Sequence, residues 1–216
     1  ARFVSVRPRD RILELGAGCG VISLAIAALH QPHEIVAIDI QPELVAMIRH
    51  SAELNGIDSI RAVEADLRAL EDSRVPRESF EVVIANPPYR ASNAGRSSPN
   101  AARHLARSEA SATLEDFVAA SSRCARRRGR VAFVFTADRS AELITMLRAH
   151  CLEPKRIRFV HPYVNAPATM VLIEARKNGG IELAIEPPLI VFDAPHAYSR
   201  EARELLGEVA SHSTTK

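Results

Sequence analysis

The fold is indicated by Arg11-Ile12-Leu13-Glu14-Leu15-Gly16-Ala17-Gly18-Cys19-Gly20, where an apolar run ends in a turn with three glycines. A short apolar run bounded by glycine predicts a buried strand, and the spacing of apolar residues over 21–29 predicts a helix. Glycine in the turn permits a positive φ and lets a ligand approach the backbone. The segment therefore predicts a strand, a ligand-accepting turn and a helix.

The same alternation of strand and helix continues along the chain. Further strands are predicted over 34–39, 60–64, 80–85, 130–135, 156–160 and 169–175, and helices over 42–55, 114–127 and 141–150. Continuously apolar strands that alternate with helices are typical of a parallel sheet covered on both faces. We therefore expect an α/β fold with a mostly parallel seven-stranded sheet and helices on both faces.

The length of 216 residues, of which 47% are hydrophobic, suits one α/β domain with a small appendage. We expect this domain over 1–178. After Asn178-Gly179-Gly180, the segment 179–216 contains short apolar runs over 181–185 and 187–192 and a helical pattern over 199–209. We expect it to be a C-terminal extension packed on the domain, not an independent domain.

The composition disfavours a membrane protein and a metal-binding protein. No run of 18 apolar residues is present, so no membrane span is expected. The three cysteines, Cys19, Cys124 and Cys151, are scattered and lack the spacing of metal ligands. We expect no metal site, and free thiols in a reducing cytoplasm.

The glycine turn differs from the dinucleotide-binding motif. That motif requires glycine or alanine at position 21, where this chain has Val21, so NAD and FAD are disfavoured. Glu14 also places a carboxylate where it would repel a pyrophosphate but tolerate a cationic amine. The turn therefore indicates a different nucleoside-bearing cofactor.

Acidic residues follow the next two predicted strands. Asp39 ends the second strand and can accept both hydroxyls of a ribose. Asp66 follows the third strand, where its carboxylate can accept an adenine N–H while the Leu67 amide meets the ring. Alone, Asp66 is more typical of a helix N-cap. In series with Glu14 and Asp39, at successive strand ends, it is predicted to contact the ligand.

Asn86-Pro87-Pro88-Tyr89 follows the predicted strand 80–85. An exocyclic aromatic amine is a poor nucleophile because its lone pair is delocalised. The Asn86 side-chain oxygen and the Pro87 carbonyl can accept its two N–H bonds and stabilise the developing positive charge. The prolines stiffen the segment, and Tyr89 offers a ring for stacking. The tetrapeptide therefore predicts in-line transfer to a planar amine, although alone it is also typical of a Pro-Pro turn.

At this point the sequence resembles a known family. Residues 12–25 together with Asn86-Pro87-Pro88-Tyr89 are similar to class I S-adenosylmethionine-dependent methyltransferases of the N6-adenine and N5-glutamine types. Narrower resemblance to the bacterial valine-tRNA (adenine-37-N6)-methyltransferase family rests on Ala102-Arg103-His104, residues 114–117, residues 153–158, Pro167-Ala168, Pro187-Pro188-Leu189, Tyr198 and Glu201.

The resemblance implies a Rossmann-like fold, S-adenosylmethionine as cofactor with S-adenosylhomocysteine as product, and transfer to the N6 of an adenine beside the anticodon of a tRNA. The catalytic residues it implies are Asn86, Pro87, Pro88 and Tyr89. The cofactor contacts it implies are Glu14, Gly16, Ala17, Gly18, Gly20, Asp39, Ile40, Asp66, Leu67 and Asn86.

Arginines cluster after the tetrapeptide, although the net charge is only +2. Between residues 90 and 130 there are nine arginines against three acidic residues. We expect the first group to contact RNA phosphates; it consists of Arg90, Arg96, Arg103 and Arg107. For the second group we favour capping of the C-terminal end of the helix 114–127 over an extension of the RNA track; it consists of Arg123, Arg126, Arg127, Arg128 and Arg130.

Four alternatives remain open. Protein N5-glutamine methylation uses the same tetrapeptide on an amide, and rRNA guanine-N2 methylation usually has Phe where this chain has Tyr89. DNA adenine methylation normally requires an added recognition domain. A non-catalytic RNA-binding relative is disfavoured by the intact Glu14, Asp39, Asp66 and Asn86.

Overall fold

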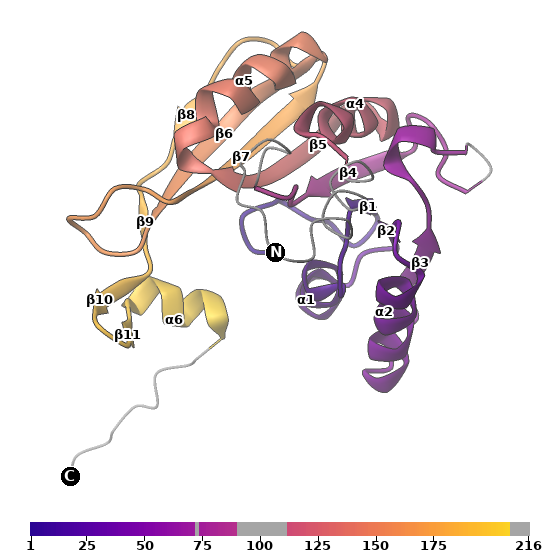
Figure 1. The fold of residues 1–216 in the computed structure, drawn as a ribbon, viewed down its shortest axis with the longest axis horizontal. Helices are drawn as coiled ribbons and strands as arrows, with labels where there is room; N and C mark the ends of the chain where they lie inside the picture. Colours follow the sequence, from indigo (N-terminus) through magenta and orange to yellow (C-terminus); the bar gives the residue numbers. More distant parts are fainter. Residues whose placement is uncertain (72–73, 90–111, 208–216) are drawn as a thin grey trace, which may run out of the picture.

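The computed structural model describes residues 1–71, 74–89 and 112–207 (Figure 1). Its principal strands are β1 (Arg11–Leu15), β2 (Glu34–Asp39), β3 (Ile60–Glu64), β4 (Phe80–Ala85), β5 (Ala125–Thr136), β6 (Leu152–His161) and β7 (Met170–Lys177). Its helices are α1 (Val21–His30), α2 (Pro42–Leu54), α4 (Leu114–Cys124), α5 (Ser140–Ala149) and α6 (Arg200–Leu206), with short 3₁₀ turns η1 (Leu67–Ala69) and η2 (Ala137–Arg139).

The seven principal strands form one sheet in the order β3-β2-β1-β4-β5-β7-β6. All neighbours up to β5 pair in parallel, and β7 pairs antiparallel with both β5 and β6. This confirms the expected α/β fold with a mostly parallel sheet. The strand order reverses between β1 and β4, and ligands of open α/β sheets bind at such a point, beyond the carboxyl ends of the strands.

The helices cover both faces of the sheet. Alternate residues of β1 point to opposite faces. Ile12 packs with Ile26 of α1, and Ala37 of β2 packs with Ile48 of α2. Leu13 belongs to the larger cluster that includes the apolar side chains of α4 and α5. Thus α1 and α2 lie on one face, and α4 and α5 on the other (Figure 1).

The residues after β7 add short strands. β8 (Ala184–Ile185) and β9 (Leu189–Ile190) pair in parallel with β6. β10 (Phe192–Ala194) and β11 (Ala197–Tyr198) form an antiparallel pair, followed by α6. The helix predicted over 199–209 ends at Leu206, because Gly207 adopts a left-handed conformation with φ of 84°.

The predicted boundary between the helix over 114–127 and the strand over 130–135 is wrong, and β6 begins at Leu152, four residues before the predicted start. The helix predicted over 114–127 ends at Cys124, and β5 begins at Ala125 instead of residue 130. Ala125 pairs with Phe80, and the register shifts before Val82 pairs with Arg130. Arg128 has φ of 60° within this irregularity. Pairing with β4 therefore overrides the helix propensity of the arginines.

The described residues contain neither a candidate membrane-spanning helix nor a candidate metal site. No described helix combines the length and hydrophobicity that a membrane crossing requires. Within the same residues, no group of His, Cys, Asp and Glu side chains is arranged to hold a metal ion.

Candidate active site

A cavity of about 490 Å³ opens at the carboxyl ends of β1 to β4, on the α4 side of the sheet. It is lined by Gly16, Ile38, Asp39, Ile40, Gln41, Ala65, Asp66, Leu67, Asn86, Pro88, Ala112 and Phe117. Seven predicted site residues thus share one cavity, although they come from four separate loops. The strand order explains this convergence, because parallel strands bring their carboxyl ends to the same edge.

The glycine turn has the predicted conformation. Gly16, Gly18 and Gly20 all have positive φ, at 62°, 56° and 81°. A Cβ added at Gly18 would meet no atom within 4 Å, whereas one at Gly20 would lie 2.8 Å from Ile48 Cγ1. Gly18 therefore leaves space next to the backbone, and Gly20 permits close packing of the turn against α2.

Asp39 holds the glycine turn and borders the cavity. Its Oδ2 accepts from the Gly18 amide at 2.9 Å, and its Oδ1 accepts from the Gln41 amide at 3.0 Å. The residue is buried, yet it lines the cavity. Because each carboxylate oxygen can accept more than one hydrogen bond, the fixed carboxylate retains capacity for ribose hydroxyls.

Asp66 lines the cavity and caps the turn η1. It accepts from the Arg68 amide at 2.9 Å and pairs with Arg68 Nη2 at 2.6 Å. The hydrogen bond from the Arg68 side chain lowers the pKa of Asp66. The N-cap alternative is therefore correct as a structural role, and the predicted ligand contact stays a prediction.

Glu14 lies on the opposite face of the sheet from this cavity. Only 3% of the residue is exposed. Its carboxylate accepts from the Ser23 amide at 3.0 Å and from the Ser23 hydroxyl, and so fixes the start of α1 against β1. Burial raises the pKa of Glu14 to about 7. Glu14, Ala17, Gly18 and Gly20 are not among the residues that line the cavity, so their predicted cofactor contacts stay predictions.

The tetrapeptide is held together by an internal hydrogen bond. The Tyr89 hydroxyl donates to Asn86 Oδ1 at 2.6 Å. Asn86 and Pro88 line the cavity, whereas Pro87 and Tyr89 do not. The acceptor predicted to bind the target amine is thus occupied by a hydroxyl of its own segment.

Phe135 and Arg139 support Tyr89 and were not predicted. The rings of Tyr89 and Phe135 lie 6.3 Å apart at 60°. The Arg139 guanidinium lies 4.8 Å from the Phe135 ring centre, and Arg139 Nη1 donates to the Tyr89 carbonyl at 3.4 Å. Phe117, from α4, forms part of the cavity wall. These residues belong to distant segments, so only the β4–β5 adjacency would have pointed to Phe135.

The predicted arginine groups have different outcomes. Arg90, Arg96, Arg103 and Arg107 lie outside the described residues. In the second group, Arg123 does lie in the last turn of α4, and it donates to the Leu70 carbonyl at 2.7 Å.

The capping prediction is wrong for the other four members of the second group, because α4 ends before them at Cys124 and they belong to β5. Arg126 pairs with Glu81 at 3.4 Å. Arg130 is buried and pairs with Asp10 at 2.6 Å, so it is unavailable to RNA as well.

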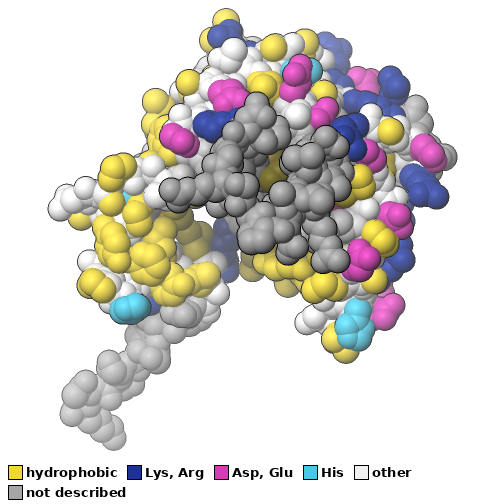
Figure 2. All heavy atoms as spheres, in the orientation of Figure 1, with side chains coloured by type: hydrophobic (Ala, Val, Ile, Leu, Met, Phe, Trp, Pro, Cys, Tyr) yellow, Lys and Arg dark blue, Asp and Glu magenta, His cyan; other side chains and the backbone are white. Residues whose placement is uncertain are grey.

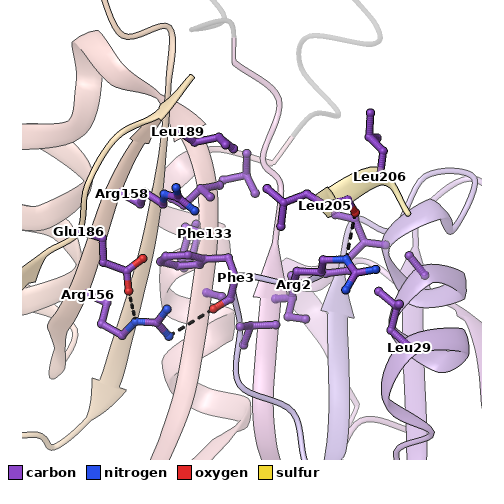
Figure 3. A pocket seen from close by; sticks show the side chains of 18 of the residues that line it. Arg2, Phe3, Leu29, Phe133, Arg156, Arg158, Glu186, Leu189, Leu205 and Leu206 are labelled. Atoms are coloured by element: carbon purple, nitrogen blue, oxygen red, sulfur yellow. Dashed lines mark hydrogen bonds and ion pairs between the residues drawn. The ribbon is translucent and has the colours of Figure 1, made fainter. Parts of the chain in front are cut away.

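A second cavity, of about 580 Å³, lies on the α1 side of the sheet, beside α6 (Figure 3). Its walls are mainly apolar, and its polar side chains already have protein partners. Arg156 Nε pairs with Glu186 at 2.6 Å, and Arg2 Nε donates to the Leu205 carbonyl at 2.9 Å. Arg158 pairs with Glu201 at 2.5 Å. Its chemistry therefore does not match that of the predicted site.

Comparisons with known proteins place the chain among methyltransferases. The model of the methyltransferase small domain family matches residues 2–150. The tRNA1(Val) (adenine(37)-N6)-methyltransferase of Bacteroides thetaiotaomicron is 25% identical over 213 residues, covering 97% of this chain and 86% of the relative. The release factor glutamine methyltransferase of Escherichia coli is 34% identical over 79 residues, covering 37% of this chain and 27% of the relative. A solved structure of a predicted O-methyltransferase from Agrobacterium tumefaciens is similar with a TM-score of 0.73 and 25% identity, covering 92% of this chain and 88% of that chain.

Proposed function

The chain belongs to the methyltransferase small domain family, and on this premise we propose that it methylates the exocyclic N6 of an adenine in RNA, in a tRNA near the anticodon. It is a methyltransferase, and its methyl donor is S-adenosylmethionine. The observation that carries the proposal is the shared cavity, which places Asn86 beside the glycine turn and Asp39.

The described residues suit the adenosine part of the donor. Asp39 supplies fixed carboxylate oxygens for the ribose, and Phe117, Leu67 and Ile40 supply apolar surface for the adenine. The positive φ and open surroundings of Gly18 allow close approach of the ligand to the backbone. When bound, S-adenosylmethionine supplies an electrophilic methyl group.

Asn86 and Pro87 act on the acceptor amine. The Asn86 side-chain oxygen and the Pro87 carbonyl accept its N–H bonds, which directs the nitrogen lone pair toward the methyl group and stabilises the developing charge. To bind the amine, Asn86 Oδ1 must exchange the Tyr89 hydroxyl for the N–H of the base. Tyr89 is then free to stack on that base. No general base is needed before transfer, because the proton leaves afterwards.

Similarity to relatives supports RNA as the substrate class. The match to a protein named as a tRNA adenine-N6 methyltransferase spans nearly the whole chain, including the residues after 150. The match to a glutamine methyltransferase covers only 79 residues. A shared tetrapeptide keeps glutamine methylation as the second candidate, because an amide nitrogen presents the same planar N–H geometry.

The experiment is transfer of labelled methyl from S-adenosylmethionine to four substrates: unmodified total tRNA, unmodified rRNA, release-factor protein and duplex DNA. We expect label in tRNA. Asn86→Ala should abolish it, whereas Asn55→Ala, at the end of α2, should leave it unchanged as the matched control. Label confined to release factor would replace the proposal with glutamine methylation, and label confined to rRNA would move it to that RNA.

A further inference from the structure

Three aromatic side chains gather beside the carboxyl end of β6. They are Tyr163, in the loop after β6, Phe192 of β10 and Tyr198 of β11. The Phe192 and Tyr198 rings stack at 5.0 Å and 20°, and the Tyr163 and Phe192 rings lie 5.8 Å apart at 37°. Tyr163 and Tyr198 are 40% and 41% exposed. In Figure 2, hydrophobic side chains gather on the left of the molecule, where Figure 1 shows β10 and β11. We call these three residues the aromatic cluster.

The backbone fixes the aromatic cluster to the main sheet. The Val191 amide donates to the His161 carbonyl, and the Phe192 amide donates to the Pro162 carbonyl, both at 2.9 Å. Ser199, next to Tyr198, donates its hydroxyl to the Ile190 carbonyl at 2.6 Å. An isolated two-stranded hairpin is only marginally stable. These bonds therefore keep the β10–β11 pair, and the rings on it, in a defined position.

The aromatic cluster lies at the same edge of the sheet as Asn86. β6 is antiparallel to β7, which is antiparallel to β5, so β6 runs in the direction of β5 and β4. The carboxyl ends of β4 and β6 therefore point the same way. They are separated by three strand spacings, about 14 Å across the sheet. Ile157 is the residue of β6 level with Ala85, so β6 also extends four residues, about 13 Å, past the end of β4. A substrate that enters the cavity at Asn86 can extend along this edge to the rings.

We propose that the aromatic cluster is a base-stacking platform for single-stranded RNA that flanks the target nucleotide. This inference rests on the proposed function. One face of Tyr198 lies against Phe192, so a base can continue the stack on its exposed side. Arg200, two residues later, has an 89% exposed side chain and pairs with Glu204. Such a surface pair is weak, so a phosphate can compete for the guanidinium.

The test measures the affinity for RNA of variants in which leucine replaces the two exposed tyrosines, so that the aromatic rings are lost but apolar side chains remain. We expect the double variant Tyr163→Leu/Tyr198→Leu to raise the Kd for an unmodified tRNA transcript about 10- to 100-fold. Tyr163→Phe and Tyr198→Phe keep the rings and should stay within about twofold of the wild type. Leu54→Ala, at an exposed position on α2, is the matched surface control. Thermal midpoint and S-adenosylmethionine affinity should be unchanged in all variants.

An unchanged Kd in the double Leu variant overturns the platform, as does an equal loss in the Phe variants, because then the hydroxyls and not the rings would matter. An aromatic cluster that binds a protein instead of RNA would give that unchanged Kd. A separate assay tests the proposed function: it fails if the wild type transfers no methyl group to any RNA. Loss of RNA affinity in the Leu variants alone would still support the platform.

Discussion

At the scale of single residues, the hydrogen bond between Tyr89 and Asn86 determines whether the Asn86 side-chain oxygen is available to the target amine. Asn86 Oδ1 is the acceptor on which the proposed chemistry depends, and the Tyr89 hydroxyl reaches it at 2.6 Å. Binding of the target amine must therefore displace an existing hydrogen bond. The exchange leaves the Asn86 acceptor hydrogen-bonded both before and after binding.

We predict that Tyr89→Phe lowers the KM for RNA about two- to tenfold and leaves kcat within a few-fold of the wild type. The phenylalanine ring keeps the stacking surface, and loss of one neutral hydrogen bond of about 0.5–1.5 kcal/mol frees Asn86 for the amine. Steady-state kinetics with a tRNA substrate measure both constants. If Tyr89→Phe is as inactive as Asn86→Ala, the hydroxyl has a direct catalytic role and this account of the hydrogen bond is wrong.

Glu14 gives a prediction for the pH dependence of stability. Burial raises its folded-state pKa to about 7, above the ordinary value of 4.5, so the folded protein keeps a proton that the unfolded chain has released. The contribution of Glu14 to the free energy of unfolding therefore falls as the pH rises from about 4.5 to about 7. We expect Glu14→Gln to gain about 3 kcal/mol relative to the wild type over this range.

Urea unfolding of both proteins at several pH values between 5 and 8 measures this difference. Glu142→Gln is the control of opposite sign. The hydrogen bond from Arg139 lowers the pKa of Glu142, so its contribution is lost only at acid pH, as the pH falls through the lowered pKa. Its difference from the wild type should be flat above pH 5. A flat difference for Glu14→Gln as well would show that Glu14 is ionised in the folded protein.

At the scale of elements, the junction between α4 and β5 shows where tertiary structure overrides local sequence. The arginines over 126–128 favour a helix by propensity alone, yet the chain enters the sheet at Ala125. Gly129 permits this, because an added Cβ would lie 2.8 Å from the Arg126 carbonyl and 3.1 Å from that of Phe80. Only the pairing partner, β4, reveals that a strand forms here.

Substitution of Arg130 tests whether its ion pair with Asp10 fixes the sheet to the segment before β1. Its side chain is buried with Asp10, which also accepts from the Arg7 amide at 2.8 Å. Arg130→Met leaves a buried carboxylate without its cation, and we expect it to lower the free energy of unfolding by about 3–5 kcal/mol. Arg126→Met breaks a more exposed pair with Glu81 and should cost less than about 1 kcal/mol. Denaturant unfolding compares the two, and equal small costs would contradict a structural role for Arg130.

At the scale of the whole molecule, the order and extent of the strands could be predicted from the sequence, whereas many contacts between side chains could not. The apolar runs at 34–39 and 80–85 match β2 and β4 because buried parallel strands are continuously apolar. The motif residues Gly16, Asp39 and Asn86 share a cavity because their strands are adjacent. Support for Tyr89 by Phe135 and Arg139 depends on packing between distant segments, which no local pattern encodes.

The residues after 178 give a further prediction at this scale. β8 and β9 pair with β6, and Arg158 of β6 pairs with Glu201 of α6. If this extension folds as part of the domain, unfolding should be a single transition by circular dichroism and calorimetry. The Glu201→Gln variant should shift that one transition without splitting it. Two separated transitions would contradict this and identify the extension as an independent unit.

The identity of the methylated nucleoside distinguishes adenine-N6 transfer at Asn86 from every other reaction considered. Unmodified tRNA is incubated with S-adenosylmethionine and the wild type, Asn86→Ala or Asn55→Ala, then digested to nucleosides and analysed by mass spectrometry. We expect N6-methyladenosine with the wild type and with Asn55→Ala, and none with Asn86→Ala. N6-methyladenosine formed equally by Asn86→Ala, or a methyl group found on another nucleoside, would contradict this expectation.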